Sequence, residues 1–117
     1  PGIVLPWADP KGRHVFHFYV LQLTDRHPLK KAEMMWELYT HRGIKAWNHY
    51  LPIHLAEPYR AQGHREGECP VAESAHERFL SLPIHPRLTD EAIDYMAAAV
   101  AEMSSGKKRA AGPGTGR

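Results

Sequence analysis

The chain has 117 residues, of which 43% are hydrophobic and 24% are charged, so its length fits one domain with a core of modest size. Its formal charge of +2 has a local origin, because four of the fifteen basic residues lie in the last fourteen positions. Residues 1–103 hold eleven basic and thirteen acidic side chains, a formal charge of −2 that argues against a nucleic-acid-binding surface.

Cysteine content and hydropathy bear on the compartment of the protein. Cys69 is the only cysteine, which excludes an intrachain disulfide and favours the cytoplasm. No apolar run approaches the roughly 20 residues that a membrane-spanning helix needs, and no secretion signal is recognisable. We therefore expect a cytoplasmic protein without a membrane partner. Because the chain begins at Pro1, we expect it to be a piece of a longer protein.

The first half of the chain predicts a strand and a helix. Residues 1–13 carry five proline or glycine residues, which predicts an entering linker without regular structure. Residues 14–23 are rich in β-branched and aromatic side chains and apolar on both alternating faces, as in a central strand covered on both sides. Pro28 suits a first helical turn, and apolar spacing up to a stop at Gly43 predicts a helix over 28–42.

The middle of the chain predicts a second strand and a second long helix. Residues 44–50 have strand character, and Pro52 ends them because proline cannot donate to a β ladder. A brief helical turn is expected over 55–62. Pro70 can open a helix whose apolar stripe continues to Leu82.

The C-terminal part predicts one more helix and a tail. Thr89 is a good N-cap for a helix over 90–103, on whose apolar stripe we place Ile93. Residues 104–117 hold no large apolar side chain, so a disordered, basic, glycine-rich tail is expected there.

The order of these elements predicts an α+β fold, with a small sheet packed against helices on at least one face. Two strands make a thin sheet. Either a third strand lies in the linker or near residues 80–84, or the sheet leans on a neighbouring domain that is missing from this chain.

Histidine spacing does not indicate a metal site. The chain holds nine histidines, but His14 and His17 fall on opposite faces of the predicted strand, and Cys69 has no cysteine partner. We therefore expect no bound metal.

The stretch 43–54 carries the candidate site residues. His49, Tyr50 and His54 surround a strand end that Pro52 interrupts, and rigid scaffolds present ligand-binding side chains at such places. The competing interpretation is that His49 and Tyr50 are half-buried strand residues whose polar tips bond to the backbone. The residues alone leave both interpretations open.

Several motifs together carry a family resemblance. They are HVFHFYVL at 14–21, the helix stop at 42–44, HYLPIH at 49–54, GECPVAE at 67–73 and LSLPIHPRLT at 80–89. In this order and at this spacing, over about residues 14–102, the chain resembles the C-terminal region of the DegT/DnrJ/StrS family of pyridoxal-phosphate-dependent sugar aminotransferases. Cys69 stands where an aromatic residue is more usual, and residues 46–48 are bulkier than is common.

The resemblance implies a fold-type-I aminotransferase whose C-terminal small domain, here residues 14–103, is a small antiparallel sheet flanked by helices. Its active site would lie between the subunits of a homodimer. The lysine that binds pyridoxal phosphate would belong to the large N-terminal domain, so this segment alone is expected to be inactive and to hold no catalytic or cofactor-binding residue. A surface ammonium is the ordinary state of Lys45, which is therefore not expected to replace that lysine.

The resemblance also implies a reaction and a site. The reaction would transfer an amino group from an amino acid, with glutamate as the expected donor, to a nucleotide-linked keto-sugar, as in polysaccharide biosynthesis. His49, Tyr50 and His54 match the H-Y-x-P-x-H pattern and are the expected substrate-binding residues, with His54 first. The alternative is a non-catalytic binding or interaction module that keeps the small domain without the cofactor lysine. Which sugar, and which of its carbons, is left open.

Overall fold

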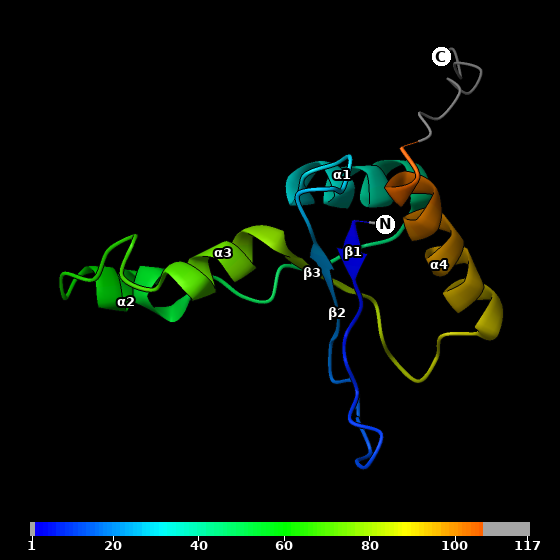
Figure 1. Cartoon of the computed structure of the whole chain (residues 1–117), viewed down its shortest axis with the longest axis horizontal. Coiled ribbons are helices and arrows are strands. Elements are labelled where there is room, and N and C mark those ends of the chain that lie inside the picture. Colours follow the sequence, from blue (N-terminus) through cyan, green and yellow to red (C-terminus); the bar gives the residue numbers. More distant parts are fainter. Residues whose placement is uncertain (1, 107–117) are drawn as a thin grey trace.

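The computed structural model describes residues 2–106. Three short strands stand at the centre, α1 and α4 cover them, and α2 and α3 extend away to one side (Figure 1). The elements are β1 (Ile3–Val4), β2 (Tyr19–Leu23), α1 (Lys31–Arg42), the 3₁₀ turn η1 (Ile53–Leu55), α2 (Glu57–Arg60), α3 (Pro70–Arg78), β3 (Phe79–Leu82) and α4 (Asp90–Ser104). Of the expected C-terminal tail, residues 107–117 lie outside the described part of the chain.

The sheet has the order β1-β2-β3, and both strand pairs are antiparallel. In the register, Ile3 faces Leu23 and Leu21 faces Leu80. This arrangement confirms the α+β fold with a small antiparallel sheet and the central place of the strand that ends at Leu23. Both places considered for an additional strand, the linker and the region near residues 80–84, contribute one.

β1 corrects the expectation that residues 1–13 hold no regular element. Gly2 has a φ of 100°, and a Cβ at this position would lie 2.8 Å from the backbone of His27. Its carbonyl accepts a hydrogen bond from the Thr24 backbone N–H at 2.9 Å. The close approach that only glycine permits therefore places Ile3 and Val4 at the edge of the sheet.

The central strand is shorter than predicted, because β2 begins at Tyr19 instead of residue 14. Tyr19 pairs with Leu82, the last residue of β3, and Pro83 ends that partner strand, so residues before Tyr19 have no ladder to join. Phe16 turns with a φ of 45°, and its N–H donates to the His14 ring at 2.8 Å. Residues 5–18 form a loop that projects from the sheet (Figure 1).

Helix α1 begins three residues later than predicted. Lys30 is extended, and its backbone N–H donates to the Glu33 carboxylate at 2.8 Å, which caps the first turn. The predicted stop is confirmed. Gly43 adopts a left-handed conformation with a φ of 64°, and the Ile44 N–H donates to the Leu38 carbonyl at 2.9 Å.

The helix predicted from Pro70 to Leu82 is two elements. Pro70 does open a helix, but α3 ends at Arg78 and the chain continues as β3. Leu80 and Ser81 are buried where they pair with β2, so burial in the sheet overrides the helical pattern of the sequence.

The strand predicted over 44–50 is also wrong in extent. It reduces to one bridge between Trp47 and Ser81, with hydrogen bonds of 2.9 and 2.8 Å in the two directions. Beyond Trp47 the segment is bonded outside the sheet, because the Asn48 side chain accepts from Lys31 and the Tyr50 carbonyl accepts from His76.

Helix α4 agrees with its prediction at the N-terminus. The Thr89 hydroxyl accepts a hydrogen bond from the Ala92 N–H at 3.2 Å, which confirms the N-cap. The buried stripe, however, contains Met96 and Ala99, whereas Ile93 is 48% exposed. The predicted place of Ile93 on the buried stripe is therefore wrong, because the residue lies to one side of that stripe.

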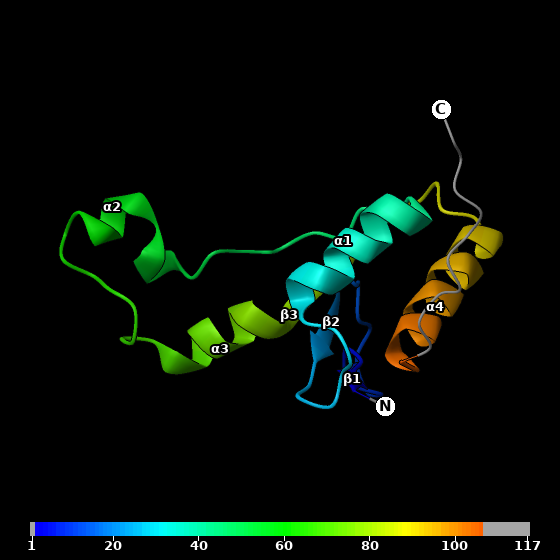
Figure 2. The same cartoon turned by 90° about the horizontal axis from the view of Figure 1, so that it is seen from above.

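The core lies between one face of the sheet and helices α1 and α4. Its buried apolar residues are Leu21, Leu23, Met34, Leu38, Ile44, Ala46, Leu80, Met96 and Ala99. We call residues 53–78, which comprise η1, α2 and α3, the arm. Neither α2 nor α3 buries a residue in the core, and Figure 2 shows the arm reaching away from α1 and α4. Among residues 2–106, no helix is long and apolar enough to cross a bilayer.

Candidate functional site

The three predicted site residues fall in two places. His49 and Tyr50 lie beside the sheet with their ring centroids 4.8 Å apart. His54 lies in η1, at the start of the arm. Within the described chain, no hydrogen bond or ring contact joins His54 to the other two. The structure therefore brings together His49 and Tyr50, but not all three.

The His49 ring is fixed by three neighbours. It is stacked on Phe18, with centroids 4.1 Å apart and planes 20° apart, and it is nearly parallel to Trp47 at 6.1 Å. Its Nδ1 lies 3.0 Å from the Ser81 hydroxyl. We call Phe18, Trp47, His49, Tyr50 and Ser81 the imidazole cluster. A ring held in this way keeps one orientation, and Nε2 is the nitrogen that Ser81 leaves free.

Ser81 was missed as a site residue because the sequence places it in a predicted helix. It is 2% exposed, and its backbone pairs with Val20 of β2 and with Trp47 of the bridge. The signal that could have found it is the pattern F-L-S-L followed by Pro83. Such a segment, short, apolar and ended by a proline, fits a buried strand as well as a helix end.

Tyr50 is the most exposed side chain of the cluster, ahead of Trp47. Its side chain is 69% exposed, and its ring meets Phe18 edge-on at 6.1 Å. Its carbonyl accepts a hydrogen bond from His76 Nδ1 of α3 at 3.0 Å. The backbone is therefore anchored while the phenol is open to a ligand.

Lys31 of α1 connects the segment 47–50 to α1 and α3. Its ammonium donates to the Asn48 side-chain oxygen at 3.2 Å and to the His76 carbonyl at the end of α3. Burial lowers the pKa of Lys31, and the nearby Glu77 carboxylate opposes that shift. Together with the bonds of Trp47, His49 and Tyr50, this contact anchors every residue from 47 to 50.

His54 has a structural partner inside the arm. It is 9% exposed, and its Nε2 donates to the Glu73 carboxylate at 2.8 Å. Glu73 also accepts from the Gly67 N–H at 2.9 Å and from the Cys69 N–H at 3.1 Å. The Gly67 N–H is the main group that holds the pKa of Glu73 below its usual range, with His54 contributing and desolvation opposing. This network fixes the 64–69 loop to α3, and a role of His54 toward substrate stays a prediction.

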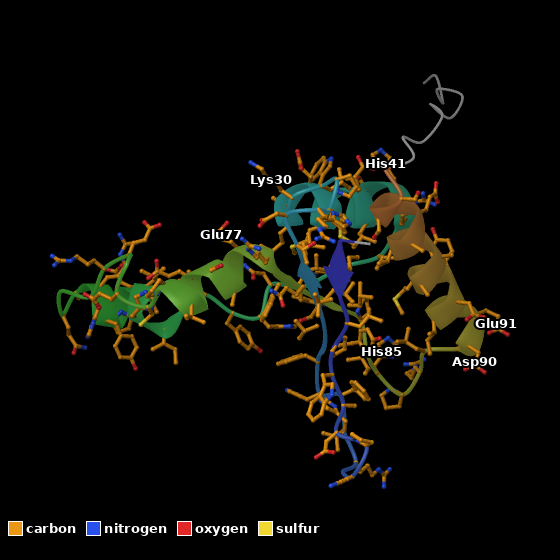
Figure 3. The ribbon with its side chains drawn as sticks, in the orientation of Figure 1. Lys30, His41, Glu77, His85, Asp90 and Glu91 are labelled. Atoms are coloured by element: carbon orange, nitrogen blue, oxygen red, sulfur yellow. The ribbon has the colours of Figure 1, made fainter. Side chains whose placement is uncertain are left out.

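Other titratable groups form ion pairs at the surface, such as Arg42 with Glu102 and His64 with Glu68. Of the residues labelled in Figure 3, Lys30 and His41 lie at opposite ends of α1, and Glu77 lies in α3. Across residues 2–106, no group of three or more histidine, cysteine or acidic side chains is arranged to hold a metal ion. Two open surface grooves lie elsewhere, one of about 460 Å³ beside Trp36 of α1 and one of about 410 Å³ beside Val71 of α3.

Comparison with known proteins identifies the family of this chain. The model of the DegT/DnrJ/EryC1/StrS aminotransferase family matches residues 2–101. The chain belongs to this family. Among curated relatives, the spore coat polysaccharide biosynthesis protein SpsC of Bacillus subtilis is 32% identical over 108 residues, which are 91% of this chain and 28% of SpsC. The dTDP-4-dehydro-2,3,6-trideoxy-D-glucose 4-aminotransferase of Saccharopolyspora spinosa is 37% identical over 98 residues, 83% of this chain and 23% of that enzyme.

A solved structure confirms the fold. The crystal structure of DesV from S. venezuelae, in complex with a ketimine intermediate, matches with a TM-score of 0.76 and 33% sequence identity. The match covers 89% of this chain and 27% of DesV. The fold is therefore that of part of a fold-type-I aminotransferase, and this chain spans about a quarter of the length of its relatives.

Two lysines of the described chain, Lys31 and Lys45, have their amines engaged by other groups. A Schiff base needs a lysine amine that faces a cavity. The amine of Lys31 is engaged by Asn48 and the His76 carbonyl, and that of Lys45 lies 4.3 Å from the Trp47 ring at the surface.

Proposed function

We propose that this chain is the C-terminal small domain of a pyridoxal-phosphate-dependent aminotransferase. The enzyme would transfer an amino group from an amino acid, glutamate being the expected donor, to a keto-sugar carried on a nucleotide. The observation that carries the proposal is the family match over residues 2–101. A relative whose name specifies a dTDP-linked sugar supports the substrate class.

His49 and Tyr50 are the residues that would meet the sugar. The exposed phenol of Tyr50 and the Nε2 of His49 can exchange hydrogen bonds with sugar hydroxyls. The exposed ring of Tyr50 also offers an apolar face to the carbon–hydrogen side of a pyranose. His54 would act at one remove, because its bond to Glu73 sets the path of the arm that follows the cluster.

The cofactor and the second subunit belong to the intact protein. The Schiff-base lysine would lie in the large domain, and the active site would lie between two subunits of a homodimer in the cytoplasm. Pyridoxal phosphate supplies the electron sink on which amino transfer depends. The small domain would contribute binding surface to that site.

The test is a comparison of the intact protein with the 117-residue chain. The intact protein is expected to show the visible absorbance of lysine-bound pyridoxal phosphate and to convert a nucleotide-linked keto-sugar to its amino form with glutamate. The isolated chain should bind no cofactor. An intact protein with another residue at the Schiff-base position and no visible absorbance would contradict the proposal.

That contrary result would favour a binding or interaction module. The contacts of Lys31 and Lys45 fit this module and the main proposal equally, so the intact protein must separate them. Such a module would bind a nucleotide sugar without turnover, which calorimetry on the intact protein would detect.

A further inference from the structure

We infer that Ser81 is a positioning residue, whose hydroxyl orients the His49 imidazole toward the sugar. The inference rests on the proposed function, since it assigns a role within that same site. Ser81 Oγ lies 3.0 Å from His49 Nδ1, which is the hydrogen bond that leaves Nε2 for a ligand.

The first support is the rigidity of Ser81 itself. Its side chain is 2% exposed, and its backbone N–H and carbonyl are both bonded to Trp47. It also pairs with Val20 of the central strand. A hydroxyl carried on so constrained a backbone has little freedom to move away from the ring.

The second support is that this serine is buried and polar in an otherwise apolar strand. Its neighbours in β3 are Leu80 and Leu82, and Leu80 is 1% exposed. A buried hydroxyl is costly unless it is hydrogen-bonded, and His49 Nδ1 is the side-chain partner that the structure gives it. The bond to His49 therefore explains why position 81 holds a serine, although a small apolar residue would fill the same space.

The third support is chemical. A serine hydroxyl can donate to an unprotonated Nδ1 or accept from a protonated one by rotating its hydrogen. Ser81 can therefore hold the ring in one place whether Nε2 is to donate to a sugar hydroxyl or to accept from it. A backbone carbonyl or an amide N–H at the same position would fix a single tautomer.

The stacking of the ring completes the arrangement. Phe18 and Trp47 set the plane of the His49 ring, but stacking leaves open a 180° flip about the Cβ–Cγ bond, which keeps the plane and exchanges the positions of Nε2 and Cε1. The bond to Ser81 removes this remaining freedom. Without it, the ring would keep its plane and lose the direction of Nε2.

The two half-reactions of transamination separate positioning from folding. In the intact protein, Ser81→Ala is expected to lower kcat/KM of the keto-sugar half-reaction by about 10- to 100-fold, as for a displaced binding group. The amino-donor half-reaction should be unchanged, because His49 is assigned to the sugar. Ser81→Thr, which keeps the hydroxyl, should restore most of the loss. Leu80→Val is the matched control for a packing defect in the same strand.

A second measurement reads the bond without turnover. Histidine-ring NMR of the intact protein should show a changed Nδ1 environment for His49 in Ser81→Ala, but not in Leu80→Val. An equal fall of both half-reactions, or a loss that Ser81→Thr does not restore, would overturn the inference. The inference would also be overturned if Ser81→Ala kept the wild-type rate of the keto-sugar half-reaction while His49→Ala lowered that rate. If His49→Ala leaves the rate of the keto-sugar half-reaction unchanged, the proposed contact between His49 and the sugar fails. An unchanged His49 NMR signal in Ser81→Ala would overturn the orienting role of Ser81.

Discussion

At the scale of single residues, two histidines of one motif have different surroundings. His49 stacks on Phe18 and has an exposed neighbour in Tyr50, whereas His54 is nearly buried against Glu73. Their positions, three residues before and two residues after Pro52, gave no reason to separate them. The contrast arises because the 3₁₀ turn at residues 53–55 directs His54 into the arm.

The surroundings of His49 and His54 predict different effects of substitution in the intact protein. His49→Ala should lower turnover of the sugar by roughly 100-fold or more, because a positioned hydrogen-bonding group is lost. His54→Ala should loosen the arm, because Glu73 loses its imidazole partner. Steady-state kinetics and limited proteolysis of the arm distinguish the two. A His54→Ala variant with an intact arm and strongly reduced turnover would return His54 to the substrate site.

Glu73 makes the stability of the arm pH-dependent. Its pKa is lowered in the folded state, chiefly by the Gly67 N–H, so the carboxylate stabilises the arm above the unfolded pKa. That contribution should disappear as the pH falls through the lowered folded value. Proteolysis of the arm at decreasing pH should accelerate in the wild type and be fast at all pH values in Glu73→Gln. The exposed neighbour Glu66 provides the control, and Glu66→Gln should follow the wild type.

At the scale of elements, local signals predicted some boundaries and missed others. The stop at Gly43, the opening of α3 at Pro70 and the cap at Thr89 depend on backbone chemistry within a few residues, and the sequence displays that chemistry directly. The extent of β2 and the existence of β3 depend on a partner strand distant in sequence. No local pattern reports that Tyr19 will meet Leu82, so the predicted strand was too long and the predicted helix absorbed β3.

For the candidate site, as for the element boundaries, the sequence predicted the local part and missed the partner that is distant in sequence. The motif at 49–54 marked His49 and Tyr50, but the partner of His49 is 32 positions away in the sequence. Ser81 reaches the ring only because β3 pairs with Trp47. The family resemblance identified the motif, and the tertiary pairing supplied the residue that holds it.

Packing of the helices predicts a contrast in stability. Leu38 of α1 is 0% exposed, so Leu38→Ala should lower the free energy of unfolding by about 2–5 kcal/mol. Ile93 of α4 is 48% exposed, so Ile93→Ala should cost well under that amount. Denaturant unfolding of both variants checks the order. Equal losses would show that Ile93 is covered in the protein, for instance by the rest of the intact chain.

The cap of α4 predicts a smaller and separate effect. Thr89→Ala removes the hydroxyl that accepts from the Ala92 N–H, which should cost about 1 kcal/mol. Thr89→Ser keeps the hydroxyl and should stay close to the wild type. Denaturant unfolding of the two variants gives the comparison, and equal losses would show that the hydroxyl is not the source of the effect.

At the scale of the whole molecule, the structure leaves large apolar side chains on two projecting segments. In the loop over residues 5–18, Leu5, Trp7 and Val15 are 63%, 76% and 80% exposed. In the arm, Ile53 and Val71 are 69% and 83% exposed. Soluble monomers seldom expose so much apolar surface on extended segments. The share of the relatives that this chain spans, about a quarter, fits an explanation in which the rest of the protein covers these surfaces.

The isolated chain should therefore self-associate, and the loop over 5–18 should contribute most to association. The reason is that Trp7 exposes the largest apolar side chain of that loop and is close in sequence to β1, at an open edge of the sheet. Burying such a side chain in a contact stabilises association by about 1.5–3 kcal/mol. Sedimentation of the 117-residue chain at rising concentration should show oligomers, and Trp7→Ser should weaken them more than Val71→Ser does on the arm. A sharply melting monomer at high concentration would show that these surfaces need no cover. Equal weakening by the two variants would instead assign the contact to both segments.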